Sequence, residues 1–201
     1  MLRITLGILI SYLVGSIPWA YIFGRLLKGI DIRQFGSGNV GATNALRVLG
    51  RGPGIVVLVL DILKGLLTVV ILGQTEILSI VFGLCCICGH NWTVFLKFKG
   101  GKGVATTLGV LLGLAIKISG LRLILGLLAI TWLSVFGFWK IISLSSVVTA
   151  IVFPVYTVLF KRFLKQPNVL ICLSIILSIL IILRHKSNLK RLFAGKEKRV
   201  F

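Results

Sequence analysis

Four polar segments of the sequence have residue types suited to binding phosphate. They cover residues 36–47, 89–107, 140–146 and 184–197, and apolar stretches flank them. Glycine lets backbone N–H groups approach an anion closely, hydroxyl and amide groups donate hydrogen bonds, and Lys and Arg supply positive charge. This composition predicts contacts with phosphate-bearing molecules.

The first segment reads Gly36-Ser37-Gly38-Asn39-Val40-Gly41-Ala42-Thr43-Asn44, followed by Arg47. It formally matches G-x-G-x-x-G, but a dinucleotide-binding loop requires a preceding strand and a βαβ unit. Here a polar connector precedes the glycines, so we reject the nucleotide interpretation. A flexible turn between two spans is the alternative to an anion site. The predicted phosphate-binding residues are Ser37, Gly38, Asn39, Gly41, Asn44 and Arg47.

The second segment joins Gly89-His90-Asn91-Trp92 to Lys97-Phe98-Lys99-Gly100-Gly101-Lys102-Gly103 and the apolar stretch after it. A P-loop needs Ser or Thr directly after its Lys, and Gly103 stands there instead. Free N–H groups, a positive helix end and an ammonium still predict an anion site. A positive-inside anchor would explain the lysines but not the glycines. The predicted residues are His90, Gly100, Gly101, Lys102, Gly103 and Thr106.

The other two segments are less specific. Serines after Lys140 open a span, where hydroxyls are usually helix caps. If the helix continues past the last span, His185 and Asn188 share a face at i, i+3. The alternative is a basic tail lying on anionic lipid, which needs neither His nor Asn. The candidates here are Ser143, Ser146, Arg184, His185, Asn188 and Arg191.

Membrane-spanning helices must position these segments. Of the 201 residues, 57% are hydrophobic, against roughly 45–50% in soluble domains, and they form blocks of about 15–20 residues, long enough to span a bilayer. Continuous apolar runs indicate helices, since a barrel would alternate with period two. We predict an all-α, polytopic membrane helix bundle of about seven transmembrane helices, forming a single domain over residues 1–201. The predicted spans are Ile4–Phe23, Gly54–Leu72, Ile77–Phe95, Val104–Ile118, Leu121–Trp139, Ser143–Phe160 and Val169–Leu183.

Charge predicts the orientation. The chain has 23 Lys and Arg against four Asp and Glu, a net charge of +19. Most basic residues face the cytoplasm if the amino terminus lies outside and the carboxyl terminus inside, although the cluster Lys161–Lys165 then lies outside. All four segments fall on the cytoplasmic side, which predicts one shared site. Nucleic acid is excluded, because the charges sit in short loops without aromatic residues spaced for base stacking.

Two further features lie within the apolar stretches. Asp61 and Lys64 stand at i, i+3 in the second span, where a charge costs about 2.5–3.5 kcal/mol on insertion scales. We predict a structural ion pair near the inner membrane edge, with support of the site as the second interpretation. The four cysteines lie inside apolar runs and are better explained as buried small thiols, so no metal site is predicted.

Together, Gly36–Asn44, Gly89–Thr106 and Arg184–Glu197 closely resemble the three motifs of the bacterial acyl-phosphate:glycerol-3-phosphate acyltransferases. The stretch Val59–Gly65 and the pair Ser143 and Ser146 are also similar to that family, so the resemblance spans nearly the whole chain. Thr93 departs from the pattern, because the family usually has Pro at that place.

The resemblance implies a multi-pass enzyme of the bacterial inner membrane with its active site facing the cytoplasm. It implies transfer of a fatty acyl group from acyl phosphate to the 1-hydroxyl of glycerol 3-phosphate, giving lysophosphatidic acid and phosphate. Lys102, His185, Asn188 and Ser143 are then the expected catalytic residues. The general base stays open among His185, His90 and the donor's own phosphate. We expect no cofactor, no metal and no obligate protein partner, with membrane lipid as the surroundings.

Three other classes compete with this interpretation. A transporter or flippase would favour inverted repeats and helices interrupted at the membrane midplane, and the sequence has no convincing internal repeat. A purely structural membrane protein would not need Gly-Gly-Lys-Gly together with Arg-His-x-x-Asn. A phosphatidyl-type alcohol transferase would need several aspartates for a divalent metal, and the cytoplasmic connectors lack them.

Overall fold

The computed structural model describes residues 1–199, over which it contains helices and no strand, as predicted. The last two residues of the predicted domain lie outside this range. Six helical stretches are long and apolar enough to cross a membrane, and Val104–Lys117 is a shorter apolar helix. Each predicted span coincides with one of these seven stretches. The helices are α1 (Leu2–Ser16), α2 (Trp19–Lys28), α3 (Ala42–Leu49), α4 (Arg51–Leu67), α5 (Glu76–Asn91), α6 (Val104–Lys117), α7 (Ser119–Trp139), α8 (Ile142–Leu159), α9 (Pro167–Arg184) and α10 (Lys186–Phe193), with short turns η1 (Ile32–Gln34), η2 (Thr68–Leu72), η3 (Val94–Leu96) and η4 (Lys161–Phe163).

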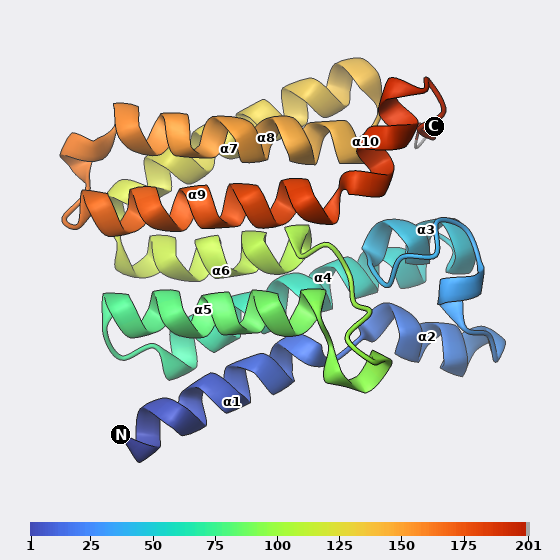
Figure 1. Cartoon of the computed structure of the whole chain (residues 1–201), viewed down its shortest axis with the longest axis horizontal. Helices are drawn as coiled ribbons and strands as arrows, with labels where there is room; N and C mark the ends of the chain where they lie inside the picture. Colours follow the sequence, from blue (N-terminus) through green and yellow to red (C-terminus); the bar gives the residue numbers. More distant parts are fainter. Residues whose placement is uncertain (200–201) are drawn as a thin grey trace. The chain divides into compact units, whose positions relative to one another are not determined.

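The chain forms two compact units, residues 1–114 and residues 115 onward, and α6 runs across their boundary. Within the first unit α1 lies along α5 and α3 packs against α4 (Figure 1). Within the second unit α8 packs against both α7 and α9. The first two polar segments therefore belong to the first unit, and the other two belong to the second.

The first predicted span, Ile4–Phe23, is not one continuous helix. α1 ends at Ser16, Ile17 has a ψ of 115°, and α2 restarts at Trp19. Pro18 explains the break, because its ring disfavours helical backbone at the preceding residue and it has no N–H to donate. The carbonyl groups of Ser16 and Ile17 become acceptors for side chains elsewhere in this unit.

α4 and α6 touch backbone to backbone in the first unit. A Cβ atom at Gly65 would overlap the carbonyl oxygen of Thr106, and one at Gly109 would overlap the carbonyl oxygen of Ile62. Small residues permit such close approach in membrane helices. This packing holds the start of α6, and hence the end of the second segment, against the helix that carries Asp61.

The last span does not continue straight past its end, so the condition for His185 and Asn188 to share one helix face is not met. α9 ends at Arg184, His185 has a φ of −96° and a ψ of 8°, and α10 then turns away from the α9 axis (Figure 1). Nδ1 of His185 lies 2.7 Å from the Ile181 carbonyl oxygen, so its ring is held at the end of α9. Asn188 lies on the other side of the bend, in α10.

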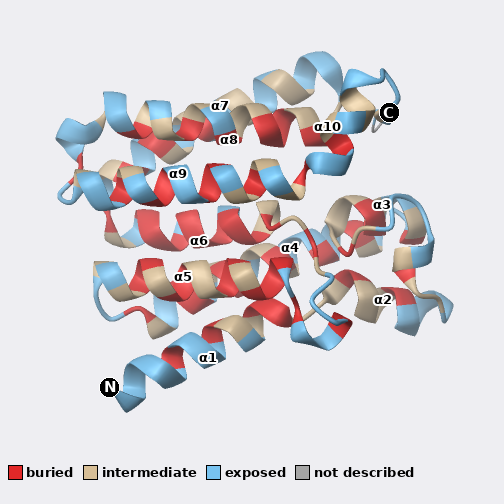
Figure 2. Cartoon of the chain, viewed as in Figure 1, coloured by how far each residue is buried: buried red, intermediate tan, exposed pale blue. Residues whose placement is uncertain are grey.

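Apolar side chains are exposed along the candidate spans. Figure 2 shows extended exposed stretches on α7, where Ile130 and Leu133 are each 62% exposed, whereas α5 is largely buried. Large aliphatic groups exposed in such numbers suit a hydrocarbon solvent rather than water.

Candidate active site

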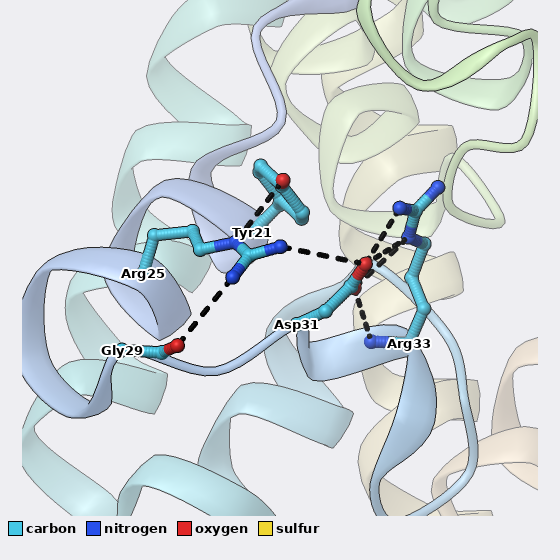
Figure 3. A network of polar contacts seen from close by, with 5 residues as sticks. All are labelled: Tyr21, Arg25, Gly29, Asp31 and Arg33. Atoms are coloured by element: carbon cyan, nitrogen blue, oxygen red, sulfur yellow. Dashed lines mark hydrogen bonds and ion pairs between the residues drawn. The ribbon is translucent and has the colours of Figure 1, made fainter.

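An ion-pair network precedes the first segment. Asp31 accepts hydrogen bonds from the backbone N–H of Arg33 at 3.0 Å and from its guanidinium at 2.6 to 3.2 Å. The guanidinium carbons of Arg25 and Arg33 lie 5.3 and 5.4 Å from the centre of the Tyr21 ring (Figure 3). The hydrogen bond from Arg33 lowers the pKa of Asp31 from 3.8 to about 2. The ionised carboxylate therefore fixes the chain where it enters the Gly36 turn.

Asn44 is fully buried, and its side chain serves the loop itself. Its Oδ1 accepts from the N–H of Ser37 at 2.8 Å and from the Ser37 hydroxyl at 3.2 Å. Its Nδ2 donates to the carbonyls of Ile32 at 3.2 Å and Phe35 at 3.1 Å. These four bonds use the whole capacity of the amide. The amide therefore shapes the loop in this structure, and phosphate binding by Asn44 stays a prediction.

The other predicted residues of the first segment line the outer side of that loop. Ser37 and Gly38 are exposed, Asn39 and Gly41 are half-buried, and Gly41 caps α3. Arg47 is exposed in the last turn of α3. Phosphate binding by these residues stays a prediction.

The glycine amides of the second segment close a turn. The N–H of Gly100 donates to the Asn91 carbonyl at 3.2 Å, and the N–H of Gly101 donates to the His90 carbonyl at 2.9 Å. The expectation that these two amides are free for an anion is therefore wrong. Glycine is required at position 101 for another reason, since a Cβ atom there would overlap Nε2 of His90.

The remaining anion-binding features lie at the start of α6. Lys102 is half-buried and directly precedes Gly103, whose φ is +77°. The first N–H groups of a helix have no partner inside the helix and carry its positive end. The Oγ1 atoms of Thr106 and Thr107 are buried and have no hydrogen-bond partner among residues 1–199. Lys102 and the α6 N-terminus thus form a positive, donor-rich corner.

The first two segments meet within the first unit. A narrow crevice brings Val40 of the first segment beside Gly100 and Gly101 of the second. Its lining residues are Ser16, Ile17, Pro18, Val40, His90, Thr93, Gly100 and Gly101.

A buried ion pair stands behind the second segment. Nζ of Lys64 lies 2.9 Å from Oδ1 of Asp61, and Nδ1 of His90 lies 3.5 Å from the same oxygen. Nζ of Lys64 also donates to the Ile17 carbonyl at 3.0 Å. The predicted pair of Asp61 and Lys64 is confirmed, and sequence reasoning missed His90 as its third member.

Thr93, where the family usually has Pro, makes two hydrogen bonds through its hydroxyl group. Its Oγ1 donates to the Ser16 carbonyl at 2.6 Å and accepts from the N–H of Phe95 at 3.3 Å. The first bond ties η3 to the break after α1. Proline could provide neither bond, so the threonine adds a local tether to the crevice wall.

In the second unit, the Glu197 carboxylate is hydrogen-bonded to three of the predicted site residues. It accepts from the Ser143 hydroxyl at 2.8 Å, from Nδ2 of Asn188, and from Nε of Arg191 at 2.6 Å. Burial alone would raise the pKa of Glu197, but the hydrogen bonds from Asn188, Ser143 and Arg191 outweigh it and lower the pKa. Sequence reasoning left Glu197 out of the site, although an acidic residue in so basic a chain was a signal.

Ser146 has a different environment from Ser143. Its hydroxyl donates to the Ile142 carbonyl at 2.9 Å and accepts from the Trp132 ring N–H at 3.4 Å. Phosphate binding by Ser146 stays a prediction. Arg184 is half-buried at the end of α9, and its role stays a prediction.

Comparisons with known proteins agree on one family. The family model described as glycerol-3-phosphate acyltransferase matches residues 5–195. Glycerol-3-phosphate acyltransferase 2 of Moorella thermoacetica is 46% identical over 97% of this chain and 96% of its own. The glycerol-3-phosphate acyltransferase of Halalkalibacterium halodurans is 40% identical over 94% of this chain and 92% of its own.

Solved structures agree as well. A crystal structure of PlsY (YgiH), an integral membrane glycerol 3-phosphate acyltransferase, in its glycerol 3-phosphate form has a TM-score of 0.85 and 35% identity, covering 98% of this chain and 96% of its own. Its lysophosphatidic acid form has a TM-score of 0.81, covering 98% and 94%. The fold is thus that of an integral membrane protein. With relatives matching over nearly its whole length, this chain belongs to the glycerol-3-phosphate acyltransferase family.

Proposed function

We propose that this chain transfers a fatty acyl group from acyl phosphate to the 1-hydroxyl of glycerol 3-phosphate. The products are lysophosphatidic acid and inorganic phosphate, an entry step of phospholipid synthesis. Family membership supports the acceptor, and the relatives solved with glycerol 3-phosphate and lysophosphatidic acid agree with it. The choice of acyl phosphate as the acyl donor rests on the many cationic and hydrogen-bond-donating groups, because both substrates then carry a phosphate.

One observation carries the proposal. The first and second segments meet at one crevice, where Val40 lies beside Gly100 and Gly101. Lys102 follows this turn directly, and Arg47 lies in the last turn of α3. Two segments about fifty residues apart can therefore both contact the two substrates, each of which carries a phosphate.

The reaction needs no covalent intermediate. The 1-hydroxyl oxygen of glycerol 3-phosphate attacks the acyl carbonyl carbon, the bond from that carbon to the phosphate oxygen breaks, and phosphate leaves with both electrons. Lys102 and the α6 N-terminus stabilise the negative charge that develops on the carbonyl oxygen. We assign the proton of the hydroxyl to the departing phosphate, because the four polar segments contain almost no carboxylate that could accept it.

The second unit contributes alignment in this proposal. Ser37 and Arg47 hold the glycerol phosphate, and Asn188, Arg191 and Ser143 orient the donor against it. Glu197 holds the last three in place. His185 caps the end of α9, with its ring against the Ile181 carbonyl. This requires all four segments to face the cytoplasm from the inner membrane, with the amino terminus outside.

The test uses the purified full chain in detergent with palmitoyl phosphate and glycerol 3-phosphate. Lysophosphatidic acid and free phosphate should form in equal amounts. Palmitoyl coenzyme A offered as donor should give no product. Product from the thioester alone would overturn the donor, and no product from either donor would overturn the acyl transfer. If His185→Ala keeps most of the turnover, His185 is ruled out as the general base.

A further inference from the structure

Asp61 and Lys64 carry charges deep in the first unit that the proposed reaction does not use. Asp61 is 2% exposed, Lys64 is 5% exposed and their partner His90 is 7% exposed. Charges in such surroundings are expensive, and those in membrane helices usually have a functional reason. Oδ1 of Asp61 lies 2.9 Å from Nζ of Lys64 and 3.5 Å from Nδ1 of His90. The pair is therefore anchored to the second segment and does more than neutralise itself.

His90 transmits this anchor to the turn. On one side its Nδ1 faces Asp61. On the other side its Nε2 lies against Gly101, where a Cβ atom would overlap it. Its carbonyl oxygen also accepts from the N–H of Gly101 at 2.9 Å. The ring is thus clamped between a carboxylate and the residue directly before Lys102.

Lys64 fixes the carboxylate in turn. Its Nζ bonds both Asp61 and the Ile17 carbonyl, which the Pro18 break sets free. The carboxylate thus contacts Lys64 of its own helix and His90 of α5, and Lys64 is in turn tied to the break after α1. A position defined this well suits a residue that orients another.

We infer that Asp61, held by Lys64, is a positioning residue that orients the imidazole of His90 and through it the turn carrying Lys102. With Nδ1 facing Asp61, the ring turns Nε2 toward Gly101. The inference rests on the proposed function for its kinetic consequence only. Its structural part can be tested without any turnover.

The first test is nuclear magnetic resonance of the histidine rings. The chain has only two histidines, so His185→Gln leaves the ¹⁵N signals of His90 alone. In that background the Nδ1 signal of His90 should be that of a protonated, hydrogen-bonded nitrogen. Asp61→Asn should shift it, whereas Thr68→Val, a buried change on the turn that continues α4, should not. An unchanged signal in Asp61→Asn would overturn the inference.

The second test is a double-mutant cycle on turnover. Asp61→Asn and His90→Gln should each lower kcat about tenfold and change the KM for glycerol 3-phosphate less than about twofold, because the transition-state cation is displaced. The double variant should match either single variant, as expected for residues acting through each other. Losses that multiply, or a loss in Asp61→Asn no larger than in Thr68→Val, would overturn the positioning role.

The two tests separate the possible failures. A wild-type chain without acyl transfer would refute the proposed function and leave the resonance test in force. If Asp61→Asn does not yield folded protein, Asp61→Glu keeps the charge that neutralises Lys64 but displaces the oxygens. Asp61→Glu should then shift the His90 signal and lower kcat, as Asp61→Asn is expected to do. Unchanged values of both would overturn the inference.

Discussion

At the scale of single residues, the second segment contains three lysines with different surroundings. Lys97 and Lys99 are exposed, whereas Lys102 is half-buried at the start of α6. A cation beside a helix N-terminus, partly shielded from water, stabilises developing negative charge more strongly than an exposed one. Lys97 and Lys99 then contribute to the positive charge on the inner side of the membrane. We expect Lys102 to act on the substrate.

Lys102→Met should therefore lower kcat by about a hundredfold or more, the usual loss when one transition-state donor is removed. Lys99→Met is the matched control, because it removes the same charge three positions earlier and should change kcat less than about twofold. Steady-state rates of lysophosphatidic acid formation measure both. Equal losses in the two variants would show that the segment acts only through its net charge.

Glu197 predicts a pH-dependent stability of the second unit. Its pKa lies below the ordinary value of 4.5 because of its three hydrogen bonds. A lowered carboxyl pKa adds stability at pH values above the ordinary pKa, and that stability is lost as the pH falls through the lowered value. The melting temperature of the wild type should exceed that of Glu197→Gln at about pH 7, and the difference should close toward about pH 3. A constant difference across this range would contradict the ionic role.

Residue types showed which side chains could bind an anion but not which were already engaged. The amide of Asn44 and the N–H groups of Gly100 and Gly101 were expected to donate hydrogen bonds to an anion. In the structure they are hydrogen-bonded within their own loops. Those bonds depend on how the chain folds back on itself, which composition does not encode. The pair of Asp61 and Lys64 was predictable because its partners lie one helical turn apart.

At the scale of elements, apolar blocks predicted the spans because crossing a bilayer demands about 20 apolar residues in a row. The interruptions were harder. Pro18 splits the first span through backbone sterics, and its position inside the apolar run was readable but was not used. The bend at His185 has no such marker, since its ring is held by a carbonyl one turn back.

Gly65 tests the close contact of α4 with α6. Gly65→Ala should lower stability by about 1–3 kcal/mol, the usual cost of overpacking, because the new methyl overlaps the Thr106 carbonyl oxygen. Gly52→Ala in the same helix has no heavy atom within 4 Å of the new methyl and should be neutral or slightly stabilising. Thermal unfolding in detergent measures both. Equal stability of the two variants would mean that α4 and α6 do not pack this closely.

At the scale of the whole molecule, the proposed function depends on where the second unit's polar segments lie. Each crossing of a membrane reverses the side on which the chain emerges. If α6 to α9 all cross, then the start of α6, Lys140 and the end of α9 emerge on one side, and Lys165 emerges on the other. The short α6 is the critical step, because a helix of 14 residues spans only about 21 Å and must rely on local thinning or protein surroundings.

Single cysteines in a background without Cys85, Cys86, Cys88 and Cys172 test this arrangement. The replaced positions, all exposed, are Gln34, Lys99, Lys140, Lys165 and Lys190. A membrane-impermeant maleimide should label only position 165 in intact cells and the other four in inverted vesicles. Labelling of positions 99 and 190 from opposite sides would mean that at least one of α6 to α9 does not cross, and position 140 on the side opposite to 99 would place the failure in α6 or α7. Lys102 could then never share a substrate with Asn188 and Arg191, and the transfer would have to run on the first unit alone.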